Sequence, residues 1–411
     1  MAYLGTNGCI EGQLSSTCLE RFFKSNGLAV TEDSAQADVV VFYACGLTEQ
    51  SERDSLMRVK RLKSDSKRSA RFIVWGCLPK INPRRLSTVY DGPQVGPMDV
   101  SYFQELLQET GIRLDNMEVG GAEDLLVSRE TSGRYEQNID PLGDAFILLQ
   151  QRWDALWKRV SKNTRFVIRV AKGCTGRCSY CSERCTFGKV KSRPIENVVS
   201  EFKSGLQQGY KRFSLMATDL GAYGRDMGCT LPDLLRRLIK IGGTRNHKII
   251  LNQVNPVYLS KYFPELQEIF RSGRIEELCS PVQSGSNRIL RLMGREYSTE
   301  EWRGYMVRIN REFPDIRLVT QFMVGYPTES DDDFDATLRL LERPLFLQNI
   351  DLYKFSERPT VRASYIEGRV SEATKDLRRK RLLKKYAKMY FLNSIIGSCK
   401  LAYPKTYELN A

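Results

Sequence analysis

Apolar and polar positions in the first ninety residues alternate between strand-like runs and helix-like faces. Continuous apolar runs at 37–45 and 71–77 have the length of buried strands, and a shorter one lies at 2–5. Between these runs, residues 15–25 and 49–63 carry apolar side chains at helical spacing. Because strands alternate with helices, the pattern predicts a parallel sheet.

The same alternation resumes after Arg165. Helical stretches such as 196–209 and 231–240 separate six candidate strands, at 165–171, 212–217, 248–252, 277–282, 316–324 and 349–353. Six strand–helix units predict a partial (β/α)6 barrel, shorter than the eight-unit form. The expected fold class is therefore α/β, with an N-terminal open parallel sheet followed by a partial barrel.

These patterns divide the chain into four expected parts. They are an N-terminal α/β domain over 1–120, a linker with helices over 121–164, a barrel over 165–355, and a basic C-terminal helix and tail over 356–411. An aromatic helix is expected within the linker, at 145–160. In the tail, residues 375–388 hold eight basic residues and one acidic residue. This helix either packs on the barrel or presents its charge to a polyanion.

Composition narrows the function classes. The chain of 411 residues has no apolar run of membrane-spanning length and no secretory signal at its start, so we expect a cytoplasmic protein without membrane contact. Its net charge of +14 suits RNA or an acidic peptide, or serves solubility alone. The single histidine, His247, is expected in a loop or at a strand edge. Cysteines and a cofactor must therefore carry any catalysis.

One group of cysteines directly follows the first predicted barrel strand. Cys174, Cys178 and Cys181 are spaced C-x3-C-x2-C. Three thiolates can hold three irons of a four-iron cluster and leave the fourth iron open to bind a small molecule. The spacing suggests S-adenosylmethionine (SAM) as that molecule. Cys185 leaves an alternative, in which four thiols close a zinc or iron–sulfur site.

A second group of cysteines follows the N-terminal strands. Cys9, Cys45 and Cys77 each lie just past the carboxyl end of a predicted strand. In an open parallel sheet these ends form the ligand crevice, so the three thiols are expected to converge there. The alternative is three buried structural cysteines.

Ordered motifs around these cysteines resemble those of one known family. GCIEGQ at Cys9, YACGLTEQSE at Cys45 and WGCLPK at Cys77 precede IRVAKGCTGRCSYC and KSRP; later come MATDLGAYG, PVQSGSNRILRLMGREYS and TQFMVGYPTESDDDF. The set resembles the radical SAM methylthiotransferases over roughly residues 3 to 390.

The resemblance implies two 4Fe–4S clusters and SAM. It implies that Cys174, Cys178 and Cys181 hold the catalytic radical cluster, and that Cys9, Cys45 and Cys77 hold an auxiliary cluster. Candidate contacts to SAM are Tyr180, which is expected near the adenine, and Asp219, Asn252, Gln253, Gln283, Ser284 and Gly285. Plain barrel packing is the alternative role for each of these contact residues.

The implied activity is insertion of a methylthio group at an unactivated C–H bond. Family members that act on transfer RNA or a ribosomal protein usually carry a further C-terminal β-barrel, and the residues after the basic helix are too few for one. We therefore expect a peptide or natural-product substrate, with transfer RNA as the alternative. The electron donor is expected to be a flavodoxin or ferredoxin. Two further alternatives are an auxiliary cluster that only relays electrons, and an RNA-binding metalloprotein without catalysis.

Overall fold

The computed structural model describes residues 1–7, 10–108, 165–241 and 247–400. The first of its two large sheets is five-stranded and parallel, with strand order β2-β1-β3-β4-β5. Its strands are β1 (Ala2–Thr6), β2 (Val30–Thr31), β3 (Val39–Ala44), β4 (Arg71–Gly76) and β5 (Gln94–Val95). The open parallel sheet predicted for the N-terminal part is confirmed.

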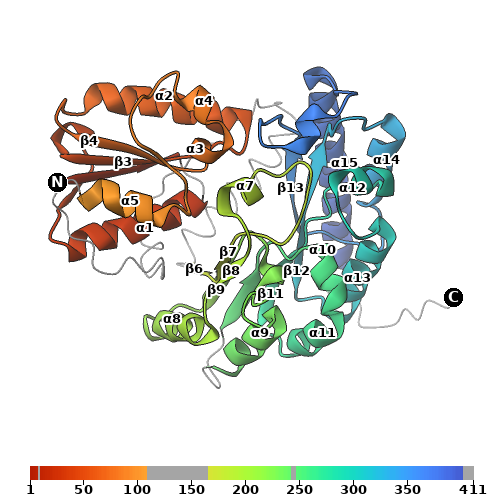
Figure 1. The fold of residues 1–411 in the computed structure, drawn as a ribbon. Coiled ribbons are helices and arrows are strands. Elements are labelled where there is room, and N and C mark those ends of the chain that lie inside the picture. The colour runs from red at the N-terminus through yellow and green to blue at the C-terminus, as the bar shows by residue number, and fades with distance from the viewer. Residues whose placement is uncertain (8–9, 109–164, 242–246, 401–411) are drawn as a thin grey trace.

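Helices cover both faces of this sheet. They are α1 (Ile10–Ser25), α2 (Glu49–Asp65), α3 (Leu78–Ile81), α4 (Pro83–Leu86) and α5 (Val100–Gln108), with a short 3-10 turn at Ser34–Gln36. Figure 1 shows α1 and α5 on one face and α2 on the other. Along β3, Val41 packs in the cluster formed with α1 and α5, whereas Phe42 packs in the cluster on the α2 face. Burial on both faces explains why this strand is continuously apolar.

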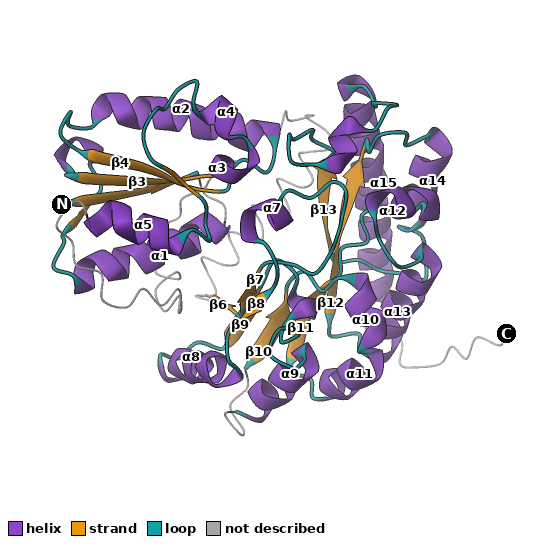
Figure 2. Ribbon diagram, in the orientation of Figure 1, coloured by secondary structure: helices purple, strands orange, loops and turns teal. Residues whose placement is uncertain are grey.

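The second sheet is six-stranded and parallel, and its strands follow one another in sequence order from β6 to β13. They are β6 (Arg165–Arg169), β9 (Arg212–Met216), β10 (Lys248–Leu251), β11 (Ile275–Cys279), β12 (Arg317–Val324) and β13 (Asn349–Lys354). This order is that of a partial (β/α)6 barrel, as predicted. Figure 2 shows the curved strands with helices outside them.

The outer helices of the barrel shield its large apolar core. They are α8 (Ile195–Gln207), α9 (Leu231–Lys240), α10 (Pro256–Lys261), α11 (Phe263–Arg271), α12 (Asn287–Met293), α13 (Thr299–Glu312) and α14 (Asp331–Arg339). Three small elements lie near the carboxyl ends of the strands: the antiparallel pair β7 (Ala171–Lys172) and β8 (Lys191–Ser192), and α7 (Glu183–Phe187).

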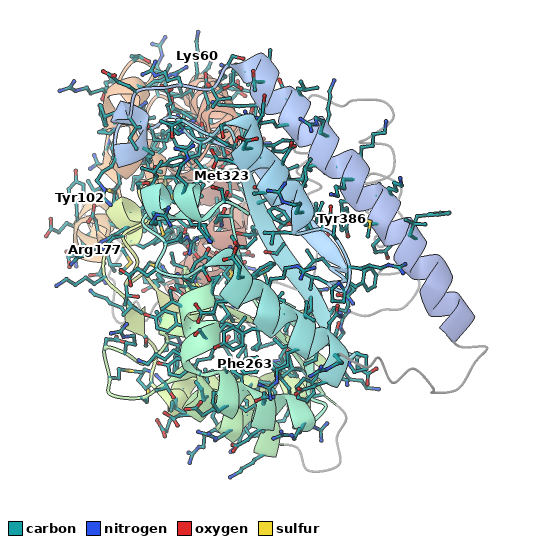
Figure 3. All side chains as sticks on the ribbon, turned by 90° about the vertical axis from the view of Figure 1, so that its right-hand side faces the viewer. Lys60, Tyr102, Arg177, Phe263, Met323 and Tyr386 are labelled. Atoms are coloured by element: carbon teal, nitrogen blue, oxygen red, sulfur yellow. The ribbon has the colours of Figure 1, made fainter. Side chains whose placement is uncertain are left out.

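The C-terminal helix α15 (Glu372–Lys400) packs on the outside of β12 and β13. Its Leu382, Leu383 and Tyr386 are buried in the barrel core. Figure 3 shows α15 crossing the outside of the barrel, with Tyr386 on the side that faces the sheet. Packing on the barrel is therefore one role of the basic helix, and its Lys375 is itself buried, with Nζ donating to the Phe355 carbonyl oxygen.

Two further expectations concern the linker and membrane-spanning helices. The linker over 121–164, with its aromatic helix, lies outside the described residues. Among the described residues, no helix is both long and apolar enough to cross a membrane.

Candidate functional site

The first candidate cluster site is the loop that follows β7. Gly173 begins the loop with φ +79°, and an added Cβ there would lie 2.1 Å from the carbonyl oxygen of Lys189. Glycine is needed because both the backbone conformation and the close approach exclude a side chain. This turn places Cys174 at the carboxyl end of the strands, which is the catalytic end of such barrels.

Two thiols of this loop face the same point. A Cβ added at Gly176 would lie 3.3 Å from Cys174 Sγ and 3.7 Å from Cys178 Sγ, and the Gly176 amide donates to Cys174 Sγ at 3.1 Å. The third thiol, Cys181 Sγ, donates to Glu183 Oε2 at 3.8 Å. The loop therefore gathers the predicted residues, with a glycine where a side chain would otherwise fill the space between the sulfurs.

Burial disfavours the ionised form of two of the loop thiols. Burial, with help from the nearby Asp219 carboxylate, raises the pKa of Cys174 to about 12, and burial also raises the pKa of Cys181 far above its usual value. Such thiols ionise only when a bound metal compensates their charge. Among the described residues, no three Cys, His, Asp or Glu side chains lie close enough together to form a metal-ligating group. The chemistry of the loop, a donor set of sulfur atoms only, fits an iron–sulfur cluster.

The second candidate cluster site lies at the carboxyl end of the N-terminal sheet. Cys45 and Cys77 directly follow β3 and β4, whose last residues, Ala44 and Gly76, are paired in register. Both cysteines are buried, and burial followed by the neighbouring Cys45 raises the pKa of Cys77. The structure therefore brings these two predicted residues together. Cys9 lies outside the described residues.

The chain that leads to Cys9 is tied to Cys45. The side-chain oxygen of Asn7 accepts a hydrogen bond from the Cys45 amide at 3.2 Å, and its NH2 group donates to Ser55 Oγ at 3.0 Å. Ser55 Oγ in turn donates to the Cys45 carbonyl oxygen at 2.7 Å. Because β1 lies beside β3, this network holds the end of β1 next to Cys45.

Packing of α3 against α7 brings the two cysteine groups toward each other. Helix α3 begins directly after Cys77, α7 begins two residues after Cys181, and the two helices are in contact. Phe187 of α7 is buried within the core cluster of the N-terminal domain. Figure 1 shows α7 between the N-terminal sheet and the barrel.

Glu183 lies between the two groups. Burial raises the pKa of this carboxyl to about 7, with further upward contributions from Glu11, Cys45 and Asp219. Its side chain is thus close to Cys181 on one side and within electrostatic range of Cys45 on the other. The sequence analysis did not single out this residue, although it is an acidic residue two positions after a predicted ligand, Cys181.

A charged network joins α1 to the first strands of the barrel. Arg169 Nη2 lies 3.0 Å from Glu11 Oε1, and Lys172 Nζ lies 3.7 Å from the same oxygen. Burial, together with the Arg169 charge, lowers the pKa of Lys172 to about 8. Because Glu11 follows the Cys9 segment and Lys172 precedes the Cys174 loop, this network links the two cysteine sites.

A buried ion pair makes a second junction between the domains. Arg358 Nη1 lies 2.9 Å from Glu52 Oε2, and the side chains are only 3% and 0% exposed. Arg85 Nε lies 3.1 Å from the other oxygen of Glu52, and Asn82 donates to both oxygens. These three partners leave the Glu52 carboxylate well paired, which a buried charge requires.

We expect the Arg358→Met variant to lower the free energy of unfolding by about 3–5 kcal/mol, because Glu52 loses its buried partner. Chemical denaturation of the reduced protein measures this loss. The matched control is Arg53→Met, which breaks the exposed pair with Glu49 on the same helix and should change stability by less than about 0.5 kcal/mol. The double variant Glu52→Gln/Arg358→Met should recover part of the loss. Equal effects of the two arginine variants would contradict this role for the buried pair.

The side chain of Tyr180 is positioned by Arg295, which contacts both its hydroxyl and its ring. Arg295 Nε donates to its hydroxyl at 3.1 Å, and the guanidinium carbon lies 5.6 Å from the ring centroid. The ring packs against the apolar cluster that includes Tyr326 and Met293. The predicted contact between Tyr180 and the adenine of SAM therefore stays a prediction, with the ring orientation fixed by Arg295.

Three predicted contact residues lie at the strand ends beside the cysteine loop. Asp219 Oδ2 accepts from Cys174 Sγ at 3.8 Å, and burial raises the pKa of Asp219 to about 6. Asn252 donates to Ser214 Oγ at 2.6 Å and is engaged within the barrel. Gln253 has φ +57°, an uncommon conformation for a residue with a side chain.

The last three predicted contact residues divide into two kinds. Gln283 has φ +70°, and its side-chain oxygen is buried without a hydrogen-bond partner. Such an orphaned acceptor fits a site that a ligand's donor completes. By contrast, Ser284 and Gly285 pack against α14, and an added Cβ at Gly285 would lie 2.4 Å from the Ala336 carbonyl oxygen. The geometry gives this pair a packing role.

Two family models match the chain. The model described as the radical SAM superfamily matches residues 168–341, and the model described as uncharacterized protein family UPF0004 matches residues 1–95. The first covers the cysteine loop and all but the edges of the barrel. Residues 168–341 form a radical SAM domain. The protein is therefore an enzyme of that superfamily, with the UPF0004 domain carrying the second cysteine site.

Curated relatives carry a consistent description. A protein of Pyrococcus abyssi, described as a probable threonylcarbamoyladenosine tRNA methylthiotransferase, is 29% identical over 87% of this chain and 77% of its own length. A protein of Thermodesulfovibrio yellowstonii, described as a tRNA-2-methylthio-N(6)-dimethylallyladenosine synthase, is 27% identical over 93% of this chain and 82% of its own. The resemblance to the radical SAM methylthiotransferases is confirmed. The expected cofactors, SAM and two 4Fe–4S clusters, are those of this family.

Solved structures share the fold. The radical SAM methyltransferase TsrM of Kitasatospora setae superposes with a TM-score of 0.60 at 14% identity, covering 88% of this chain and 76% of its own. The cobalamin-dependent radical SAM enzyme OxsB superposes with a TM-score of 0.55 at 13% identity, covering 94% of this chain and 56% of its own. At this identity the likeness concerns the arrangement of an N-terminal sheet before a radical SAM barrel.

Proposed function

We propose that this enzyme is a tRNA methylthiotransferase that replaces a hydrogen on an unactivated carbon of a modified adenosine with a methylthio group. The observation that carries the proposal is the juxtaposition of two cysteine sites across the α3–α7 contact. A single radical cluster needs no second thiol site beside it, whereas sulfur transfer does. The descriptions of the curated relatives favour tRNA over the peptide or natural-product substrate expected above. The net charge of +14 supports the same choice.

In this proposal Cys174, Cys178 and Cys181 hold the radical cluster, and Cys45 and Cys77 hold the auxiliary cluster together with Cys9. When bound, the clusters and SAM would supply the electron, the hydrogen-abstracting radical and the methylthio group.

The remaining tasks fall to the protein. Arg295 fixes the orientation of the Tyr180 ring near the radical-cluster loop. The orphaned side-chain oxygen of Gln283 accepts a donor of the bound cofactor. Glu183, between the two cysteine sites, borders the space in which the target carbon must lie. The buried ion pair between Glu52 and Arg358 fixes the position of the N-terminal domain, and so of its cysteine site, relative to the barrel. Its burial excludes water from the contact between the two domains.

Turnover with defined substrates tests the proposal. The protein is reconstituted anaerobically with iron and sulfide, reduced with dithionite, and supplied with SAM and total tRNA from cells that lack methylthiolated nucleosides. Mass spectrometry of the digested RNA should show adenosines in which one SCH3 replaces one hydrogen. A peptide mixture in a parallel reaction should remain unchanged.

Other outcomes decide against the proposal in specific ways. Methylthiolation of a peptide alone would restore the first substrate expectation. A changed product without added sulfur would favour an auxiliary cluster that relays electrons. Absence of 5′-deoxyadenosine in a fully reconstituted sample would leave only the non-catalytic, RNA-binding alternative.

A further inference from the structure

The segment between β13 and α15 packs directly on the radical-cluster loop. The Ala363 amide donates to the Ser179 carbonyl oxygen at 2.8 Å, and Arg362 Nη2 donates to the Arg177 carbonyl oxygen at 2.7 Å. Thr360 lies within hydrogen-bond distance, 3.3 Å, of Ser182 Oγ. These bonds attach the segment to both ends of the loop that contains Cys178 and Cys181.

Tyr365, two residues beyond Ala363, is an exposed aromatic side chain on this segment. It is 75% exposed, the largest value among the exposed large hydrophobic side chains that the structure describes. Its hydroxyl donates to the Pro359 carbonyl oxygen at 2.9 Å, which holds the ring in place. A fixed, exposed ring loses little conformational entropy when a planar group stacks on it.

Two arginines are linked to this segment: Arg362 begins the 3-10 turn that ends at Tyr365, and Arg362 bonds to the backbone of Arg177. Arg177 and Arg362 are both exposed, and within the described part of the chain neither forms an ion pair with a carboxylate. Nearby Arg369, by comparison, is paired with Glu357 at 3.0 Å. Figure 3 labels Arg177 at the rim of the molecule. Arg177 belongs to the cysteine loop itself, so this charge borders the reaction site.

We propose that Arg177, Arg362 and Tyr365 form a contact surface for an unpaired nucleotide that neighbours the target nucleotide of the RNA substrate. The Tyr365 ring stacks on its base, and the two guanidinium groups contact the adjacent phosphates. Aromatic stacking beside basic side chains is how proteins bind unpaired RNA, whose bases can be splayed from the helix. The inference rests on the proposed function, because it requires an RNA substrate.

Binding measurements with the reconstituted holoenzyme test the surface. Fluorescence anisotropy with a labelled tRNA anticodon stem-loop should show that Tyr365→Ala weakens binding roughly tenfold, since stacking of one base is lost. Tyr365→Phe and Tyr365→Trp should bind within about twofold of the natural protein, because both keep a ring. Arg362→Ala should weaken binding and reduce the slope of log K against log salt by about one.

The matched control is Phe391→Ala. Phe391 is 62% exposed on α15, and the adjacent Tyr390 packs on Phe346, which precedes β13 at the opposite end of the barrel. This variant should bind RNA as the natural protein does. Iron content and RNA-independent 5′-deoxyadenosine formation should be unchanged in the Tyr365 and Phe391 variants, which separates RNA binding from damage to the cluster loop.

The results also distinguish this surface from the proposed function. If the natural protein neither binds nor modifies tRNA, the proposed function fails. If it does both and Tyr365→Ala binds equally well, only the present inference is overturned. A defect seen with a flavodoxin as reductant, but absent with dithionite and in RNA binding, would assign the surface to the electron donor instead.

Discussion

Alanine at Cys174, Cys178 and Cys181 together should abolish reductive cleavage of SAM. The reconstituted natural protein should hold about eight irons per chain, and this triple variant about four, because only the auxiliary site remains. Formation of 5′-deoxyadenosine with dithionite should fall below detection. Iron analysis and chromatography of the reaction mixture measure the two effects.

Cys185→Ala is the control for this variant. Cys185 is exposed on α7, and its thiol donates to the Thr360 carbonyl oxygen at 3.9 Å. The variant should keep its iron and its activity. A loss of iron equal to that of the triple variant would instead support a closed four-thiol site.

Alanine at Cys45 and Cys77 should separate reductive cleavage of SAM from transfer of the methylthio group. The double variant should also hold about four irons, now at the radical site. It should still produce 5′-deoxyadenosine but no methylthiolated product, because the sulfur-supplying site is gone. Mass spectrometry of the nucleosides and chromatography of the small molecules, taken from one reaction, measure both results.

The corresponding control is Cys229→Ala, a partly buried thiol in the loop before α9. Its iron content and product yield should match those of the natural protein. An unchanged iron content in the Cys45/Cys77 variant would show that the N-terminal cysteines are structural, as one sequence interpretation allowed.

Much of the fold could be predicted because burial on both faces leaves a strong sequence signal. Strand β3 is apolar throughout since Val41 and Phe42 face different helix layers. The sequence-based prediction was wrong or incomplete where tertiary packing determines the local structure. The helix predicted from Ser15 begins at Ile10. By contrast, His247 lies in the loop directly before β10, as expected, but the sequence did not indicate its burial, with its ring 5.2 Å from that of Phe202. Periodicity does not show that α8 covers this position.

Some features of the candidate site could likewise be read from the sequence, whereas others depend on the fold. That Cys174 and Cys178 share one loop with Cys181 could be predicted, because the three lie within eight residues; their role as ligands of the radical cluster stays a prediction. The Glu52–Arg358 pair could not be predicted, since its partners are 306 positions apart and neither stands out locally. Glu183 and the orphaned oxygen of Gln283 likewise acquire meaning only from what surrounds them.

The Glu52–Arg358 junction has a consequence for how the two domains can be recombined. Its acidic half lies on α2, whereas its basic half lies after the last barrel strand. A chimaera that joins this N-terminal domain to another barrel therefore inherits a buried carboxylate without its arginine unless that barrel supplies one. The two halves are thus not freely interchangeable modules, and a functional exchange must transplant residues from opposite ends of the chain together.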